Sequence, residues 1–357
     1  MSLNGDLIRE ILDRVDGITL ANAGCVSSDF WSIARQEGLW EEACCSVWPS
    51  TRDTQIKDLI SSSLGGFKTF YADCFPVIEY GDDSRPKIEP NSLQVHDPIH
   101  SDFVWVVDVI YKNKPIYSNV VWGIPAADEF PDLFCNSQFR LDLINFNDID
   151  FYADIDQNNE HELPTITMSV DKQEKDGKFL EQLMENLMLS WILINKKTGQ
   201  AANLSSWRPL VGEIEWPSDE EFVIGFGSVL PAHNIYDFNA VQCKLMMKCR
   251  VSDDDHMSLK ITELSMELEG MMGASVNGSK SLLILERALS CRKSKDHKQI
   301  LESHQRYFKE KGNLIETNLK SGQSSLGTLL DCLCILSGFF ACVSFGYFIF
   351  KESGLVF

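Results

Sequence analysis

The first forty residues constrain the fold more than any other stretch of the chain. They contain three short segments in which apolar residues recur at helical spacing. Asp16-Gly17 ends the first segment as a turn, Thr19 can cap the second, and Ser27 or Ser28 can start the third. Domains below about 40 residues rarely bury a stable core alone. No metal-ligand cluster lies in this stretch, so the sequence predicts that a partner completes it.

The order of these residues resembles an F-box. The match consists of Leu-x-x-Asp-Leu at the start, Ile11-Leu12 in the first helix, the Cys25-Val26-Ser27 turn, a tryptophan in the third helix and a closing Leu39-Trp40. One departure is Leu3-Asn4, where the family pattern has Leu-Pro. The alternative is an ordinary small helical bundle that packs on the rest of the chain.

The resemblance implies that apolar side chains of these helices enter a groove of a Skp-type adaptor. The residues predicted to bind the adaptor are Leu3, Leu7, Ile8, Ile11, Leu12, Val15, Leu20, Val26, Trp31, Leu39 and Trp40. The implied function is that of the substrate-recognition subunit of an SCF ubiquitin ligase, which reaches a cullin through the adaptor and recruits an unknown protein substrate. Such a subunit is not an enzyme and needs no cofactor.

The resemblance continues beyond the first forty residues. Segments such as Leu189 to Pro209 are similar to a small subgroup of plant F-box proteins that ends in an apolar tail. The strand order is loosely similar to phloem-lectin-type sandwiches, although no sugar site follows from that likeness. A membrane-tethered carbohydrate-binding or scaffolding protein without a ligase role is therefore the alternative function.

Composition excludes several other classes of protein. The net charge of −20 disfavours nucleic acid, because a phosphate backbone would be repelled. The eleven cysteines form no CxxC pair and no zinc-type cluster, and no signal peptide precedes the first helix, so we expect reduced thiols in the cytosol. His96 and His100 share a polar loop that is not expected to bind a metal. Gly225-x-Gly227 lacks the rest of a nucleotide loop, and no catalytic motif occurs.

The middle of the chain has the two-residue period of strands. After the F-box (1–48), a helical connector and loop (49–100) lead to a β-rich substrate-recruitment domain (101–290). Its expected strands include 103–111, 116–122, 139–144, 189–194, 222–226, 241–249 and 259–268, with 281–286 as the last. The fold class is therefore α+β, with a mainly antiparallel, sandwich-like domain after the helices.

The C-terminal part of the chain is predicted to be helical and to end in a membrane. A basic helical connector (291–325) precedes the apolar segment 326–350, in which the nineteen residues from Cys332 to Phe350 carry no charge, and a short tail follows (351–357). About twenty apolar residues span a bilayer as a helix, and apolar residues occupy every face of this one. The prediction is a single-pass C-terminal anchor with the bulk of the chain in the cytosol or the nucleus. A buried core helix is the alternative.

Overall fold

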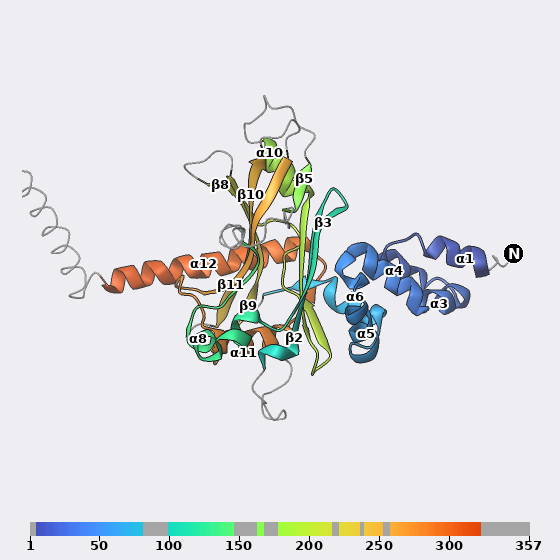
Figure 1. Ribbon diagram of the computed structural model, residues 1–357, viewed down its shortest axis with the longest axis horizontal. Helices are drawn as coiled ribbons and strands as arrows, with labels where there is room; N and C mark the ends of the chain where they lie inside the picture. Colours follow the sequence, from blue (N-terminus) through green and yellow to red (C-terminus); the bar gives the residue numbers. More distant parts are fainter. Residues whose placement is uncertain are drawn as a thin grey trace, which may run out of the picture. The chain divides into compact units, whose positions relative to one another are not determined.

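The computed structural model describes residues 5–80, 99–145, 163–167, 178–215, 221–235, 239–252 and 258–322. The chain divides into two compact units, Met1–Gln305 and Arg306–Phe357. The first unit is mixed α+β, with helices at the N-terminus followed by two β-sheets (Figure 1). This confirms the predicted order of helices and sheets.

The helices at the N-terminus follow one another with short turns. They are α1 (Gly5–Leu12), α2 (Gly17–Ala23), α3 (Ser28–Ala34), α4 (Glu37–Val47), the 3-10 helix η1 (Pro49–Arg52), α5 (Thr54–Ser63) and α6 (Phe67–Cys74). Gly65 and Gly66 separate α5 from α6 with positive φ angles of 72° and 90°, which glycine adopts without steric cost.

Two sheets contain the strands of the first unit. One has the order β12-β1-β7-β6-β2-β3 and the other the order β4-β11-β10-β9-β8, with β5 paired to β11. All pairings are antiparallel among the described strands except β1 with β7. The bounds are β1 Val77–Ile78, β2 Phe103–Tyr111, β3 Lys114–Trp122, β4 Arg140–Asn145, β5 Thr165–Thr167, β6 Leu187–Asn195, β7 Gln200–Asn203, β8 Val211–Ile214, β9 Glu221–Pro231, β10 Ala240–Ser252, β11 Ser258–Gly270 and β12 Lys293–Ser294.

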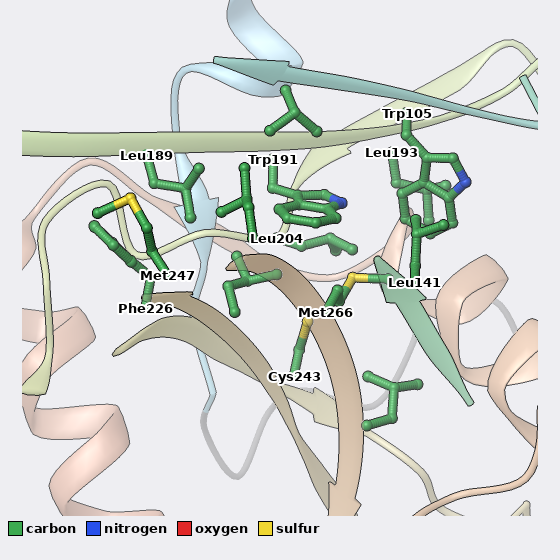
Figure 2. Packing of buried hydrophobic residues seen from close by; sticks show 14 of the residues in the cluster. Trp105, Leu141, Leu189, Trp191, Leu193, Leu204, Phe226, Cys243, Met247 and Met266 are labelled. Carbon is green, nitrogen blue, oxygen red and sulfur yellow. The ribbon is translucent and has the colours of Figure 1, made fainter. Parts of the chain in front are cut away.

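The central strands β6 and β2 of the first sheet are buried on both faces, which explains the unbroken apolar run of β2. One face, represented by Trp105 and Trp191, packs on side chains of the second sheet such as Met247 and Met266 (Figure 2). The other face, which includes Val106, belongs to a separate core formed with the N-terminal helices. Strands covered on both faces lose the polar alternation of half-exposed strands. The order of layers is thus helices, first sheet, second sheet.

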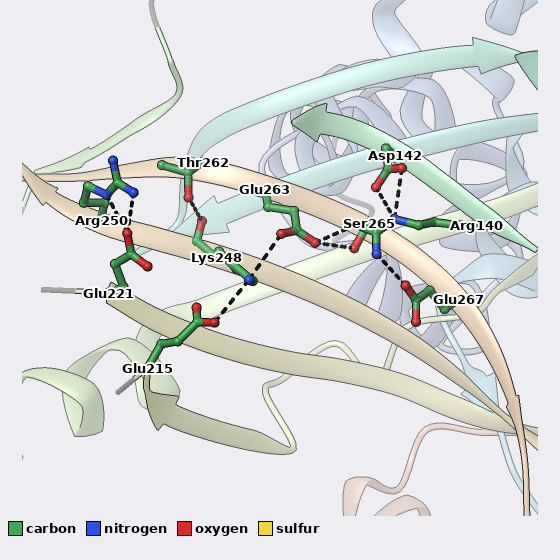
Figure 3. A network of polar contacts seen from close by, with 10 residues as sticks. All are labelled: Arg140, Asp142, Glu215, Glu221, Lys248, Arg250, Thr262, Glu263, Ser265 and Glu267. Carbon is green, nitrogen blue, oxygen red and sulfur yellow. Dashed lines mark hydrogen bonds and ion pairs between the residues drawn. The ribbon is translucent and has the colours of Figure 1, made fainter. Parts of the chain in front are cut away.

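The second sheet keeps the alternation, with apolar residues inward and charged residues outward. Figure 3 shows this outer face, where Arg140 on β4 bonds the carboxylates of Asp142, Glu263 and Glu267 at 2.8, 2.8 and 2.5 Å. The register of β10 and β11 shifts after Lys248, a β-bulge. Because of this network, the face carries charges of both signs rather than a uniform negative field.

One predicted strand is wrong. Residues 281–286 belong to the helix α11 (Gly278–Ala288), whose N-terminus is capped by the Asn277 side chain, which accepts a hydrogen bond from the Lys280 amide at 3.1 Å. Leu282, Leu285 and Ala288 are buried at helical spacing. A short apolar run does not distinguish a strand from a buried helix by itself, and the asparagine cap decides the matter here.

Three further helices complete the described part of the chain before the C-terminus. They are α7 (Pro125–Glu129), α8 (Pro131–Asn136) and α10 (Lys178–Asn186), and a 3-10 turn, η2, spans His100–Asp102. Residues 81–98, within the predicted connector and loop, and residues 146–162 lie outside the described residues.

The C-terminal helix α12 spans His297–Gly322, within the range 291–325 that the sequence analysis assigned to a helical connector. Among the described residues, no helix is both long and apolar enough to cross a bilayer. The predicted transmembrane segment, 326–350, lies outside them.

Candidate functional site

The candidate site is the N-terminal module, by which we mean helices α1 to α4, residues 5–47. Side-chain caps fix where its short helices begin. The Asp16 carboxylate accepts hydrogen bonds from the Thr19 amide at 2.7 Å and hydroxyl at 3.2 Å, and the Ser27 hydroxyl accepts one from the Phe30 amide at 3.3 Å. Capping satisfies amides that have no partner inside the helix, and this matters most in helices of two turns.

Five of the eleven predicted adaptor-binding residues form the module's own core. Ile8 and Leu12 on α1 are only 2% and 3% exposed, and they share a cluster with helix residues further along the chain. The other members of this buried group are Leu20, Leu39 and Trp40. The Trp40 indole N–H donates to the Ala34 carbonyl at 2.8 Å, which satisfies its polar atom. These residues hold the module together rather than face solvent.

Four others of the eleven are exposed to solvent. Leu7 and Ile11 are 46% and 48% exposed, and their spacing of four places them on one face of α1. Val26 after α2 is 71% exposed, and Trp31 on α3 is 51% exposed beneath the Arg35 guanidinium, 4.4 Å from its ring. Val15 is half-buried, and Leu3 lies outside the described residues.

Ile18 on α2 joins this exposed group, although the sequence pattern did not predict it. Helical periodicity could have indicated the exposure of Ile18. Leu20, two positions later, is fully buried, and a step of two residues along a helix turns the side chain to a different face. We use the name exposed apolar set for Leu7, Ile11, Ile18, Val26 and Trp31. Three successive helices contribute large apolar side chains to solvent within a very short stretch, which is typical of an interaction site.

Gly17 explains how α2 packs on the rest of the molecule. A Cβ atom at this position would lie 2.4 Å from Cζ of Tyr71 on α6. The ring of Tyr71 also contacts Trp40, with ring centroids 5.6 Å apart. The Asp16-Gly17 turn therefore gives both a cap and the close approach that lets α2 lie against α6.

Comparison with known proteins agrees with this geometry. F-box protein At3g44326 of Arabidopsis thaliana is 27% identical over 99% of this chain and 92% of its own length. F-box protein At2g27310 of the same plant is 25% identical over 95% of this chain and 92% of its own length. The chain is thus similar to plant F-box proteins over nearly its whole length.

A third relative matches a smaller part more closely. F-box protein GID2 of Oryza sativa subsp. japonica is 39% identical over 20% of this chain and 34% of its own length. No family model and no solved structure matches the chain. Similarity to F-box proteins is consistent with a non-catalytic adaptor role.

Packed side chains join the F-box module to the first sheet. Trp48, which directly follows the module, stacks on Trp207 with centroids 6.1 Å apart, and the Trp207 indole N–H donates to the Phe75 carbonyl at 3.0 Å. On η1, the Ser50 amide and hydroxyl donate to the Asp108 carboxylate of β2 at 2.9 and 2.5 Å. The module thus continues into the β-sheets through a buried interface.

Asp108 is the buried acid at this interface. Burial raises its pKa from an ordinary value of 3.8 to about 6, although hydrogen bonds from Ser50 and Ser118 lower it in part. The group is fully buried, and among the described residues it is hydrogen-bonded to two serine side chains and a backbone amide rather than to a cation. Its charge therefore costs stability near neutral pH, which makes it a sensitive reporter of the junction.

The described residues show no cluster of three or more side chains suited to a metal ion. His100 instead pairs with Asp128, at 2.8 Å between Nε2 and Oδ1, and His96 lies outside the described residues. Nothing in this arrangement assigns a reacting group.

Proposed function

We propose that the chain is the substrate-recognition subunit of an SCF ubiquitin ligase, which binds a Skp-type adaptor through its F-box module and recruits a target protein for ubiquitination. The observation that carries this proposal is the exposed apolar set, placed on a small module whose core is already filled by other residues. The family relation adds the identity of the partner.

Burial of the exposed apolar set supplies enough energy for a stable complex. Covering one large apolar side chain is worth about 1.5–3 kcal/mol before ordering costs. Leu7 and Ile11 are close to half exposed, so each still has about half of that gain to make on binding. Helices that place such anchors in an apolar groove follow a common mode of peptide recognition.

The chain would then act by position rather than by chemistry. The adaptor would link it to a cullin, and the β-rich part would hold the target close to the transferred ubiquitin, which raises the effective concentration of the target. The two-sheet domain supports this division of tasks because it forms its own core, separate from that of the F-box helices.

We further propose that residues 326–350 anchor the chain in a membrane and leave the sheets and the F-box on the cytosolic side. The support is the nineteen-residue uncharged run from Cys332 to Phe350, long enough for a spanning helix. The F-box partners act in the cytosol or nucleus, which fixes the side.

The adaptor complex is tested by two kinds of substitution on α1, one at exposed residues and one at a buried residue. Leu7→Ser/Ile11→Ser should abolish co-purification with a Skp-type adaptor while the circular dichroism spectrum and melting temperature stay unchanged. Glu10→Ser, an exposed change on the same helix, is the matched control and should bind normally. Ile8→Ser should lose the fold of the module as well as binding, because its side chain is buried.

Wild-type adaptor binding by a folded Leu7→Ser/Ile11→Ser variant would contradict the proposed role. Binding lost together with the melting transition would instead place these two residues in the core.

A further inference from the structure

A cavity of about 460 Å³ lies where the F-box module, the first sheet and the segment before α12 meet. Its apolar lining includes Phe75, Ile110, Met188 and Trp207, and its polar lining includes Asn113 and Ser206. Cavities of this size with an apolar lining and a few polar groups are typical of sites for small molecules. None of the residues of the exposed apolar set lines this cavity.

Trp207 forms a wall of the cavity in a fixed position. Its backbone has φ of 64°, which is uncommon for a residue with a bulky side chain, and its amide donates to the Ser205 hydroxyl at 3.2 Å. The indole of Trp207 stacks on the buried Trp48 and donates its N–H to the Phe75 carbonyl, as described above. These two contacts hold the indole in place. Backbone strain of this kind is concentrated at binding sites, because the surrounding structure must maintain it.

The charge of the lining has the opposite sign to that of the chain. Arg208 and Lys295 are both exposed lining residues, and no described lining residue is acidic, although the chain as a whole carries −20. Arg208 uses one N–H on the Glu185 carbonyl, at 3.4 Å, and no ion pair of either cation is found among the described residues. Guanidinium and ammonium groups beside an apolar cavity favour an organic anion.

From the cavity, the fixed tryptophan and the two cations, we propose that this site binds a small organic acid with a flat apolar body. The body lies against Trp207 and Met188, and the acid group lies toward Arg208 and Lys295. The occupant would contact α4, the first sheet and the segment before α12 at once, so its binding would tie the F-box module to the β domain.

The test uses the purified full-length chain, with 6-fluoro-2-naphthoate as the probe and its uncharged amide as the matched neutral compound, followed by fluorine NMR titration. The naphthoate should bind at one saturable site, about ten-fold more tightly than the amide. Arg208→Gln/Lys295→Gln should weaken naphthoate binding about ten-fold and leave amide binding unchanged. Arg9→Gln/Lys260→Gln, two cations exposed elsewhere, is the matched control and should bind as the wild type does.

A second variant tests the cavity rather than its charge. Ser46 is an exposed lining residue on α4, so Ser46→Trp should fill the space and abolish binding of both compounds. Equal affinity for naphthoate and amide, unchanged binding by the charge variant, or full binding by a folded Ser46→Trp protein would overturn the proposal. Should Ser46→Trp fail to fold, the charge variant decides, because both of its residues are exposed. The adaptor-deficient Leu7→Ser/Ile11→Ser protein should bind naphthoate normally, which separates failure here from failure of the proposed ligase role.

Discussion

Replacement of Asp108 by asparagine should stabilise the protein near neutral pH and not in acid. The wild-type carboxyl has a pKa of about 6 in the fold against 3.8 ordinarily, so the folded state holds the proton more tightly than the unfolded state does. Stability from this group is therefore fully present below about pH 4 and is lost as the pH rises to about 6. The two pKa values differ by about two units, and each unit corresponds to about 1.4 kcal/mol. Ionisation of Asp108 therefore lowers the free energy of unfolding by about 3 kcal/mol in total.

Asparagine preserves most of the hydrogen bonds at the junction. Its amide oxygen can accept from the Ser50 amide, and its NH₂ group can donate to the Ser50 hydroxyl. The asparagine side chain does not ionise, so the variant keeps the free energy of unfolding that the wild type loses as the pH rises. Asp108→Ala also does not ionise, but it leaves the buried Ser50 groups without their acceptor, so it should be less stable than Asp108→Asn by about 1–3 kcal/mol at any pH.

The assay is urea unfolding of wild type and Asp108→Asn at pH 5, 6 and 7.5, above the isoelectric point near 4.7, where net charge keeps the chain soluble. All other titrating groups are common to the two proteins and cancel in the difference. From the two pKa values, the advantage of the variant should grow by about 1.4 kcal/mol between pH 5 and 7.5. A constant difference across this range, or one that shrinks with rising pH, would refute the assignment of Asp108 as a buried charge.

Three further outcomes are expected. Gly17→Ala should lower the melting temperature and weaken adaptor binding, because its Cβ would lie 2.4 Å from the Tyr71 ring, whereas Gly38→Ala, with no atom within 4 Å, should not. Arg140→Met should cost about 1–2 kcal/mol in low salt and less in 0.5 M salt, since three carboxylates lose their common partner; equal cost in both would contradict the network. Deletion of residues 326–357 should release the chain from carbonate-washed membranes, and release of the intact chain under the same wash would contradict the anchor.

Local patterns in the sequence predicted the elements that local chemistry determines. The helices of the F-box module follow from apolar spacing and from the Asp16 and Ser27 caps, and the long β10–β11 hairpin follows from alternation. Both depend on residues only a few positions apart. The misassigned helix α11 shows the limit, because its four consecutive apolar residues suit a strand equally well until the cap is considered.

Long-range contacts determined what the sequence pattern could not. Leu7, Ile8, Ile11 and Leu12 are all apolar, and nothing local tells which pair faces α3 and which faces solvent. The two-residue strands β1 and β12 pair with each other although they lie more than two hundred residues apart along the chain, and β1 also pairs with β7. The cavity has the same origin, since its walls come from segments that no local pattern places together.

The double burial of the first sheet has a consequence for the ligase role. Strand β2 sends Val106 and Asp108 toward the F-box side and Trp105 and Val107 toward the second sheet. The F-box module is therefore joined to the β domain through packed side chains rather than through a flexible linker. A linker would spread a bound target over a large volume, whereas a packed junction confines it and raises its effective concentration at the ubiquitin-carrying partner. Selection of lysines on the target would then depend on the geometry of this junction, so that Asp108 substitutions should change which lysines are modified even where target affinity is unaltered.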